Sequence, residues 1–273
     1  MTEVRKTSTR GVGCVSYLNS KPLIEPLLNR PDIHVQFAVP SALGDLLARG
    51  EVDAALLPIV DYQTSPTELV LVPAGCIGCH GHTLTVRIFS RVPPQEITRL
   101  YADTDSHTSV ILAQVVLREF HNTSPEILAL TPADAADWDS MESVLLIGDK
   151  VINAAPPPGL YPWQLDLGDQ WCGNTGLPFV FAMWMMPAGN PDRNLAQELA
   201  AARKAGDIMT DELVARYAAA KGWPPDLLHR YYRHYLDYQV KPASRQGIEE
   251  FYRLASIYQL LQVHRPVRYL DIP

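Results

Sequence analysis

The feature that most constrains the fold is an alternation of strand-like and helix-like segments at the start of the chain. Three short apolar runs, at 11–15, 33–39 and 52–57, are typical of buried strands. Helical patterns separate them, one beginning near Pro22 and the next near Pro40, since a missing N–H costs nothing at a helix start. Strands and helices that alternate at this spacing form parallel sheets with right-handed crossovers. The opening of the chain is therefore predicted to be an α/β unit.

The residues that follow the first and third strands form a candidate ligand-binding rim, because ligands bind beyond the carboxyl ends of strands in such sheets. The first strand leads into Ser16, Tyr17 and Asn19, and the third ends at Pro58. The helix after the first strand offers unpaired N–H groups and the positive end of its dipole. Ser16 and Asn19 can add side-chain hydrogen bonds. The alternative is that Ser20 merely caps the helix.

A second strand–turn–helix unit begins with a short strand at 100–102 and enters a long apolar helix at 110–120. The turn between them is rich in hydroxyl groups. Ser106, Thr108 and Ser109 are expected to hold an anion at the helix N-terminus, with His107 among them. The alternative is a plain Ser/Thr cap, which needs one hydroxyl where this turn offers three.

Polar residues also follow later segments of the chain. A strand predicted at 143–147 ends in Gly148 and Asp149, and a polar stretch that includes Thr175 and Gly176 precedes another buried strand. These residues are further candidates for the ligand site, because they too lie at the ends of predicted elements.

Two lobes are predicted from this order of segments. We expect residues 1–89 and 178–273 to form one lobe, which includes a helical carboxyl-terminal region, and residues 90–177 to form an inserted second lobe. Crossings near 85–90 and 175–181 would then act as a hinge. Small ligands favour the cleft between two such lobes.

The composition narrows the classes of function. The net charge of −7 at pH 7 and the absence of a basic run argue against a nucleic-acid partner. No apolar stretch reaches the roughly 18 residues of a membrane span, and the polar amino end lacks the apolar region of a signal peptide. We therefore expect a cytoplasmic protein, without a membrane partner, whose four cysteines are reduced thiols.

One segment matches a known cofactor-attachment motif. Cys76-Ile77-Gly78-Cys79-His80 matches the haem attachment pattern CxxCH, and with His82 it offers ligands that suit zinc. Covalent haem attachment of that kind occurs outside the cytoplasm, and no second cluster follows at zinc-ribbon spacing. We interpret the segment as a glycine-rich connection between strands and predict no metal.

A run of tyrosines near the carboxyl end could be taken for a nucleic-acid stacking surface. Tyr231, Tyr235 and Tyr238 recur at helical spacing in an acidic protein. Amphipathic packing explains this pattern better, so we predict a structural role for these side chains.

Several segments together resemble the chorismate dehydratases of the futalosine route to menaquinone. They occur in the family's order and cover most of the chain, so they are more specific than any single motif. A sister enzyme of that route, which makes dihydroxynaphthoate, has a similar fold, but its SPCPND-like opening is absent here. The segments that carry the resemblance are VSYLNSKPL, GEVDAALLPIVDY, TVRIFS, DTDSHTSV, LLIGDK and DLGDQWCGNTGLPFVFAMW.

The resemblance implies an α/β fold of the two-lobed periplasmic-binding-protein type II class, with mixed sheets flanked by helices and a two-crossing hinge. It implies a cytoplasmic carbon–oxygen lyase without a cofactor, which removes water from chorismate to give 3-[(1-carboxyvinyl)oxy]benzoate. The alternatives are a small-anion binding module of the same fold and the sister enzyme.

The resemblance also assigns residues to roles. Asn19 and Thr85 correspond to family positions at the reacting end of the substrate. The family usually has serine at position 85 and arginine at position 107, so Thr85 keeps the hydroxyl while His107 removes a possible arginine–carboxylate contact. The substrate-binding residues expected from the turns and from the resemblance are Ser16, Tyr17, Pro58, Ser106, His107, Thr108, Ser109, Gly148, Asp149, Thr175 and Gly176.

The base that removes the substrate proton has three candidates. Asp149 and His107 are two of them, and the third is the substrate's own enolpyruvyl carboxylate, which lies close to the proton that is lost. We favour the third, because Asn19 and Thr85 are neutral hydrogen-bonding residues and such a mechanism needs no stronger base from the protein.

Overall fold

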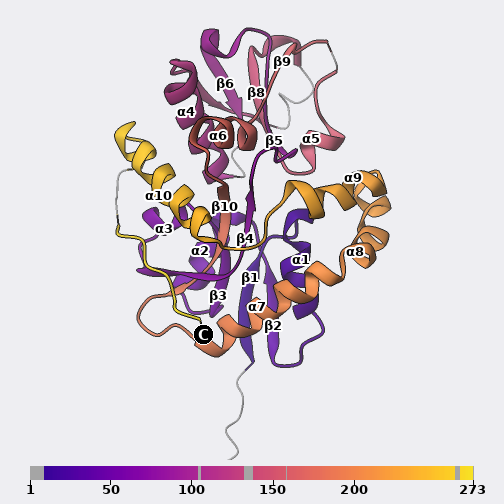
Figure 1. Ribbon diagram of the computed structural model, residues 1–273, viewed down its shortest axis with the longest axis vertical. Helices are drawn as coiled ribbons and strands as arrows, with labels where there is room; N and C mark the ends of the chain where they lie inside the picture. Colours follow the sequence, from indigo (N-terminus) through magenta and orange to yellow (C-terminus); the bar gives the residue numbers. More distant parts are fainter. Residues whose placement is uncertain (1–8, 104–105, 132–137, 158, 262–264, 273) are drawn as a thin grey trace, which may run out of the picture.

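The computed structural model describes residues 9–272 except 104–105, 132–137, 158 and 262–264. It is built on two five-stranded sheets, one above the other in Figure 1, each with helices around it. This is the mixed α/β architecture that the alternation of segments predicted.

The first sheet has the strand order β2-β1-β3-β10-β4. Strand β1 pairs in parallel with β2 and with β3, as predicted, because a crossover that contains a helix joins each strand to the next in the chain. The late strand β10 enters antiparallel between β3 and β4, so the sheet is mixed. The strands are β1 (Arg10–Cys14), β2 (Ile33–Phe37), β3 (Ala54–Pro58), β4 (Leu69–Cys79) and β10 (Phe179–Pro187).

The second sheet has the order β7-β6-β8-β5-β9, with β6 parallel to β7 and β8 and with β5 antiparallel to β8 and β9. The strand at 126–129 was not predicted, because it lies at the sheet edge and its four side chains are exposed or half-buried. The strands are β5 (Val86–Ser90), β6 (Arg99–Ala102), β7 (Glu126–Ala129), β8 (Ser143–Ile147) and β9 (Trp163–Asp166).

The helices complete both layers. Helix α7 packs on α1 and β4, whereas α10 contacts both β10 of the first sheet and α4 beside the second (Figure 1). The helices are α1 (Lys21–Ile24), α2 (Pro40–Ala48), α3 (Asp61–Thr64), α4 (His107–His121), α5 (Lys150–Asn153), α6 (Leu167–Thr175), α7 (Arg193–Ile208), α8 (Thr210–Tyr217), α9 (Pro225–Arg230) and α10 (Pro242–Ile257), with a π-helical turn, η7 (Tyr231–Tyr235), after α9.

Two sequence interpretations are corrected here. The first predicted helix is instead a series of short turns around α1, because Pro22 and Pro26 interrupt its hydrogen bonds. The CIGC segment is not a connection but the end of β4, where it pairs with β10. Cys76 and Cys79 are both buried there, and burial raises the pKa of each thiol well above its usual range.

The chain passes from the first sheet to the second between β4 and β5, and returns between α6 and β10. Strand β5, residues 86–90, pairs entirely within the second sheet. The first crossing therefore comes before Val86, a few residues earlier than the sequence suggested. The division into lobes at 1–89 with 178–273 and at 90–177 stays a prediction.

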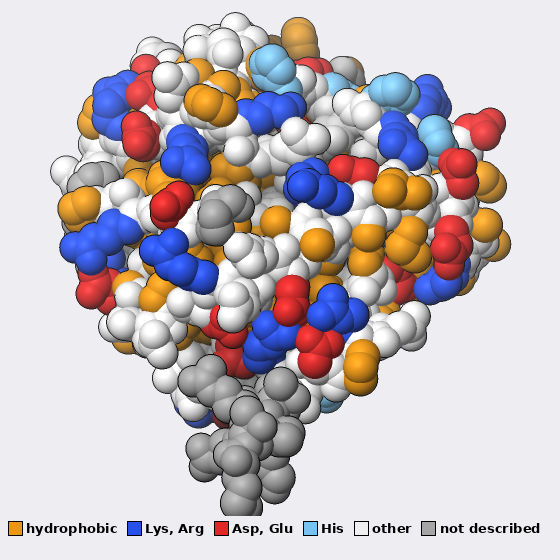
Figure 2. Space-filling view, turned by 60° about the horizontal axis from the view of Figure 1, so that its bottom comes forward, with side chains coloured by type: hydrophobic (Ala, Val, Ile, Leu, Met, Phe, Trp, Pro, Cys, Tyr) orange, Lys and Arg blue, Asp and Glu red, His pale blue; other side chains and the backbone are white. Residues whose placement is uncertain are grey.

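The distribution of charge on the surface is relevant to the prediction that the protein has no nucleic-acid partner. On the face shown in Figure 2, acidic and basic side chains are interspersed, and the drawn residues that are described form no continuous basic patch there. Arg10 illustrates the pairing, since it contacts Asp32 and Glu198 at 2.7 Å each. Among the described residues, no helix is both long enough and apolar enough to cross a bilayer.

Candidate active site

A cavity of about 210 Å³ lies where the two sheets meet. Its walls come from the turn after β1, from β3 and β10, from the turn before α4, and from the end of β8. The crossing segment 83–86 and Tyr231 of η7 complete the lining. Most of the lining is apolar, with a few polar side chains that converge on it, as is usual for small-ligand sites. The apolar residues include Val15, Leu56, Ile77, Ile147 and Phe181.

The cavity brings together eight of the residues predicted from the sequence, from segments that lie far apart in the chain. Residues of the two predicted rims therefore line one cavity, and their roles stay a prediction. The eight residues are Tyr17, Asn19, Pro58, Thr85, Ser106, Ser109, Gly148 and Asp149.

The other five predicted residues do not line the cavity. Ser16 is exposed beside it, and Thr108 is fully buried behind it. Thr175 donates its hydroxyl to the Trp171 carbonyl (2.8 Å), and Gly176 ends α6 in a left-handed conformation (φ 70°). These two residues terminate a helix in the structure. The fifth residue, His107, is turned toward the first sheet and is described below.

Asn19 is held by the short helical turn after β1. The Ser20 hydroxyl does not cap the following helix but lies within hydrogen-bonding distance of the carbonyls of Val15 (2.9 Å) and Tyr17 (2.8 Å), which fixes the turn. The capping alternative for Ser20 is therefore wrong. The Asn19 Oδ1 atom is buried at the cavity and has no hydrogen-bond partner among the described residues. Such an acceptor is costly unless a ligand supplies a donor.

Thr85 is paired with a residue that sequence reasoning assigned to packing. Its Oγ1 atom lies 2.8 Å from the hydroxyl of Tyr231, and both side chains are buried and line the cavity. Burial raises the pKa of Tyr231 well above its usual range, so the phenol stays protonated. Tyr231 begins the π-helical turn η7, a feature found often at functional sites. That turn is not visible in the sequence pattern.

A charged pair lies on the wall formed after the ends of β6 and β8. Lys150 Nζ contacts Asp103 Oδ2 at 2.6 Å, and both residues line the cavity. Lys150 was not predicted as a site residue, although it directly follows Gly148 and Asp149. It is the one cationic side chain in the described lining. It is therefore suited to meet a ligand carboxylate.

Asp149 lines the same wall at the start of α5. Burial raises the pKa of its carboxyl above the usual value, while the charge of Lys221 and the Trp223 indole act in the opposite direction. A raised pKa means that the folded protein holds the neutral form of Asp149 more readily than water does.

The turn before α4 supplies a helix cap and also lines the cavity. Ser106 is the N-cap of α4, and its Oγ accepts a hydrogen bond from the Ser109 N–H at 3.2 Å. The Ser106 and Ser109 hydroxyls lie 2.9 Å apart, and both line the cavity. The cap is therefore real, and it leaves the hydroxyl-rich helix N-terminus facing the ligand space.

His107 bridges elements beside the two sheets. Its Nδ1 lies 3.1 Å from Oδ1 of Asp61, the first residue of α3, while His107 itself begins α4. The hydrogen bond to Asp61 raises the pKa of the imidazole, and partial burial opposes this. Because His107 binds Asp61 rather than lining the cavity, the geometry disfavours it as a base for a ligand there.

Comparisons with known proteins are consistent with this geometry. Residues 11–256 match the family model described as menaquinone biosynthesis. A chorismate dehydratase from Thermus thermophilus is 29% identical over 255 residues, which cover 88% of this chain and 93% of that relative.

Solved structures share the fold at low sequence identity. Protein AF1704 from Archaeoglobus fulgidus aligns with a TM-score of 0.70 at 13% identity, over 92% of this chain and 97% of that one. The periplasmic aliphatic sulphonate binding protein SsuA from Escherichia coli aligns with a TM-score of 0.66 at 17% identity, over 97% and 95%. The predicted periplasmic-binding-protein-like fold is thus confirmed. With the family match spanning most of its length, the chain belongs to the menaquinone biosynthesis family.

Proposed function

We propose that this protein is a chorismate dehydratase, a hydro-lyase that acts in the cytoplasm on chorismate without a cofactor. Membership of the menaquinone biosynthesis family and the Thermus relative support this assignment. The observation that carries it is the cavity itself, which Asn19 lines together with the Thr85–Tyr231 hydroxyl pair, and the buried Asn19 Oδ1 has no hydrogen-bond partner among the described residues.

The reaction is a redox-neutral elimination. The C–H bond at the ether-bearing ring carbon breaks, its electrons form a ring double bond, and the hydroxyl on the neighbouring carbon leaves. The proton and the hydroxide make up the released water, and the ring becomes aromatic in 3-[(1-carboxyvinyl)oxy]benzoate. Because aromatisation drives the step, the protein mainly has to orient the substrate and stabilise the charge on the departing oxygen.

Different polar groups of the cavity can orient the substrate and stabilise the leaving oxygen. Ser106 and Ser109 at the N-terminus of α4 would bind one carboxylate, and Lys150 the other. Asn19 Oδ1 would accept the hydrogen of the ring hydroxyl in the bound substrate. Thr85, supported by Tyr231, would donate to that oxygen as it leaves.

The base in this proposal is the enolpyruvyl carboxylate of the substrate. His107 is occupied with Asp61 outside the cavity lining, and Tyr231 has its pKa raised and serves as a hydroxyl partner. Asp149 lines the cavity, but burial disfavours its charged, basic form. The substrate carboxylate is already placed beside the proton that it would remove.

The lobes predicted at 1–89 with 178–273 and at 90–177 would close on the substrate about the two crossings. The cavity between the sheets supports this inference, since polar groups line it from both sides, with Asn19 in the turn after β1, and Ser106 and Lys150 beside the second sheet.

Incubating the purified protein with chorismate tests the proposal. We expect a new aromatic absorbance band and a product lighter than chorismate by one water. The Asn19→Ala variant should lower kcat about a hundredfold with a smaller change in KM, because the ring hydroxyl loses the acceptor that orients it for departure. Asn174→Ala is the matched control, since that amide is exposed and donates to the Gln170 carbonyl within α6. If the protein binds chorismate but does not convert it, the dehydratase assignment is wrong and the protein is a binding module.

A further inference from the structure

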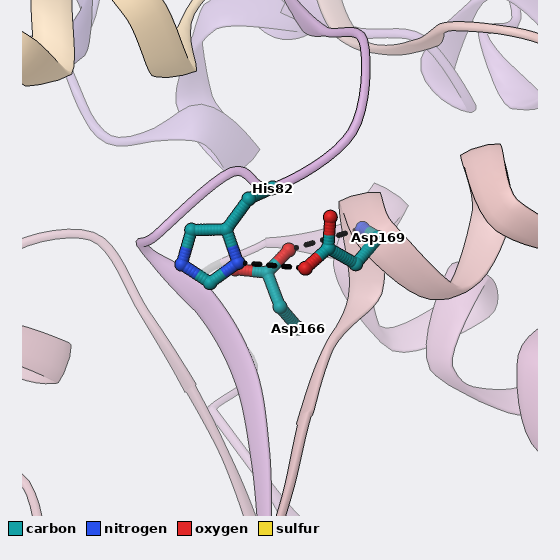
Figure 3. A group of neighbouring side chains, drawn as sticks. All are labelled: His82, Asp166 and Asp169. Carbon is teal, nitrogen blue, oxygen red and sulfur yellow. Dashed lines mark hydrogen bonds and ion pairs between the residues drawn. The ribbon is translucent and has the colours of Figure 1, made fainter.

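Three side chains with metal-binding chemistry, His82, Asp166 and Asp169, meet beside the crossing between the sheets (Figure 3). His82 Nδ1 lies 2.9 Å from Asp169 Oδ2 and 3.2 Å from Asp166 Oδ2. Asp166 is buried. It accepts hydrogen bonds from four backbone N–H groups, those of Thr83 (2.9 Å), Leu84 (2.8 Å), Gly168 (3.0 Å) and Asp169 (3.2 Å).

These contacts give the cluster a role other than metal binding. A guanidinium can only donate, so Arg87, at 3.1 Å, donates to His82 Nε2. The hydrogen of the neutral ring then sits on Nδ1, which donates to Asp169. Both ring nitrogens of His82 and both oxygens of Asp166 are thereby committed to protein partners. A metal ion at this position would have to displace several of these bonds.

The segment that Asp166 holds is strained. Leu84 has a φ of 69°, one of the few positive values at a non-glycine residue in the described chain. The Thr85 N–H donates to the Thr83 carbonyl at 2.8 Å, which closes a three-residue γ-turn with Leu84 at its centre. The positive-φ form of this turn is rare and costly for a residue with a side chain. Such strain persists only where the surroundings enforce it.

The turn ends at the reacting residue. Thr85 follows Leu84 directly, accepts the Gly148 N–H through its carbonyl (2.8 Å) and places its hydroxyl against Tyr231 (2.8 Å). If Leu84 relaxed to a negative φ, the chain direction at Thr85 would change, and its hydroxyl would leave the cavity. The orientation of Thr85 therefore depends on whatever stabilises the turn.

We infer that Asp166 is a positioning residue, whose carboxylate holds the γ-turn at Leu84 and so aims the Thr85 hydroxyl into the cavity. The inference rests on the proposed function, since it concerns the residue proposed to act on the leaving group. Asp166 does this while also capping α6, so it ties the crossing between the sheets to the helix that leads into the return crossing. His82 and Arg87 close the cluster from the outer side.

The Asp166→Asn variant separates the two roles of the carboxylate. Asparagine keeps one oxygen, which can still cap α6 and accept from Thr83. Its NH₂ group then faces the Leu84 N–H, and because both groups are donors no hydrogen bond forms between them. The turn loses its support while the helix cap survives. Asp192→Asn is the matched control, because Asp192 caps α7 through the N–H groups of Asn194 (2.9 Å) and Leu195 (3.0 Å), away from the cavity.

We expect Asp166→Asn to lower kcat for chorismate about 10- to 100-fold, the range for a misplaced reacting group, with KM changed by less than about threefold. Asp192→Asn should change neither. Adding Leu84→Gly to Asp166→Asn should restore part of kcat, because glycine adopts a positive φ without strain. Thermal melting of each variant checks that the assayed protein is folded. If Asp166→Asn does not fold, Leu84→Pro breaks the same turn and should give the same kcat loss.

The outcomes are separable. Wild-type protein that fails to convert chorismate overturns the proposed function. With wild-type protein active, an unchanged kcat in folded Asp166→Asn, or a loss confined to KM, overturns the positioning role. A fall in kcat that Leu84→Gly does not relieve also overturns it, because the turn would then not be the route by which Asp166 acts.

Discussion

Replacing Tyr231 by phenylalanine removes one hydroxyl from the centre of the proposed mechanism. The Tyr231 side chain is 1% exposed, and within the described structure its hydroxyl has Thr85 Oγ1 as hydrogen-bond partner, at 2.8 Å. The contact allows either hydroxyl to donate, and in the proposed mechanism Tyr231 donates to Thr85. The Thr85 hydrogen is then directed elsewhere, toward the cavity. Phenylalanine keeps the packing of the ring, but the Thr85 hydroxyl loses the partner that fixes its orientation and can rotate.

The size of the effect follows from the hydrogen bond that is lost. A buried neutral bond contributes about 0.5–1.5 kcal/mol net, and about 1.4 kcal/mol corresponds to a tenfold change in rate. We therefore expect Tyr231→Phe to lower kcat up to about tenfold. Thr85→Ala, which removes the donor itself, should cost about a hundredfold. If Tyr231 acts only through Thr85, the double variant should be no slower than Thr85→Ala alone.

The assay is the initial rate of aromatic product formation from saturating chorismate, for the wild type, both single variants and the double variant. Tyr232→Phe is the control, because the neighbouring hydroxyl is also buried but donates to the Leu18 carbonyl (3.1 Å) and does not line the cavity. It should lower the melting temperature without a comparable loss of kcat. Strictly additive losses in the double variant would refute the relay from Tyr231 to Thr85.

Three further predictions concern the rest of the site. Ser109→Ala should raise KM for chorismate severalfold with little change in kcat, measured from the same rates. The reason is that the contact with the substrate carboxylate is equally strong in the bound substrate and in the transition state. The pKa of His107 is raised above its ordinary 6.5, so its bond to Asp61 stabilises the fold fully below that pH and loses this effect as pH rises through the higher folded value. His107→Gln should therefore lower the melting temperature at pH 6 more than at pH 9, and equal losses at both would contradict this. The pKa of Asp149 is also raised, so its charge destabilises the fold at neutral pH. Asp149→Asn should raise the melting temperature at pH 7, with a difference that shrinks as pH falls toward 3.8, and should keep substantial turnover.

Local pattern was enough to predict the parallel half of the first sheet. The strands near 11–15, 33–39 and 52–57 are short apolar runs separated by helical patterns, and such runs have few other ways to bury themselves. The rule that ligands bind at the carboxyl ends of strands then placed Asn19 and Pro58 at one edge. The same reasoning brought Ser106 and Asp149 to the facing edge, and the cavity contains all four.

The remainder depends on contacts that no local pattern encodes. Tyr231 meets Thr85 across 146 residues, and its spacing to the other tyrosines fits packing equally well. The positive φ of Leu84 has no signature, since leucine rarely adopts it. Cys76 and Cys79 were mistaken for part of a connection because the glycine between them is usual in turns. In β4 that glycine lets the backbone pass close to Phe179, whose carbonyl would lie 2.7 Å from an added Cβ at Gly78.

The fold alone does not distinguish an enzyme from an anion receptor, so the distinction has to come from the groups in the cavity. A carboxylate only accepts hydrogen bonds, and it can satisfy Lys150 and the hydroxyls of Ser106 and Ser109 but not the buried Oδ1 of Asn19. A ligand that also carries a donor would satisfy that atom, and chorismate presents its ring hydroxyl. The aromatic product has lost this hydroxyl, so Asn19 Oδ1 would again lack a partner once water has left. The product should therefore bind more weakly than chorismate although it keeps both carboxylates, and the same group that selects the substrate favours release of the product.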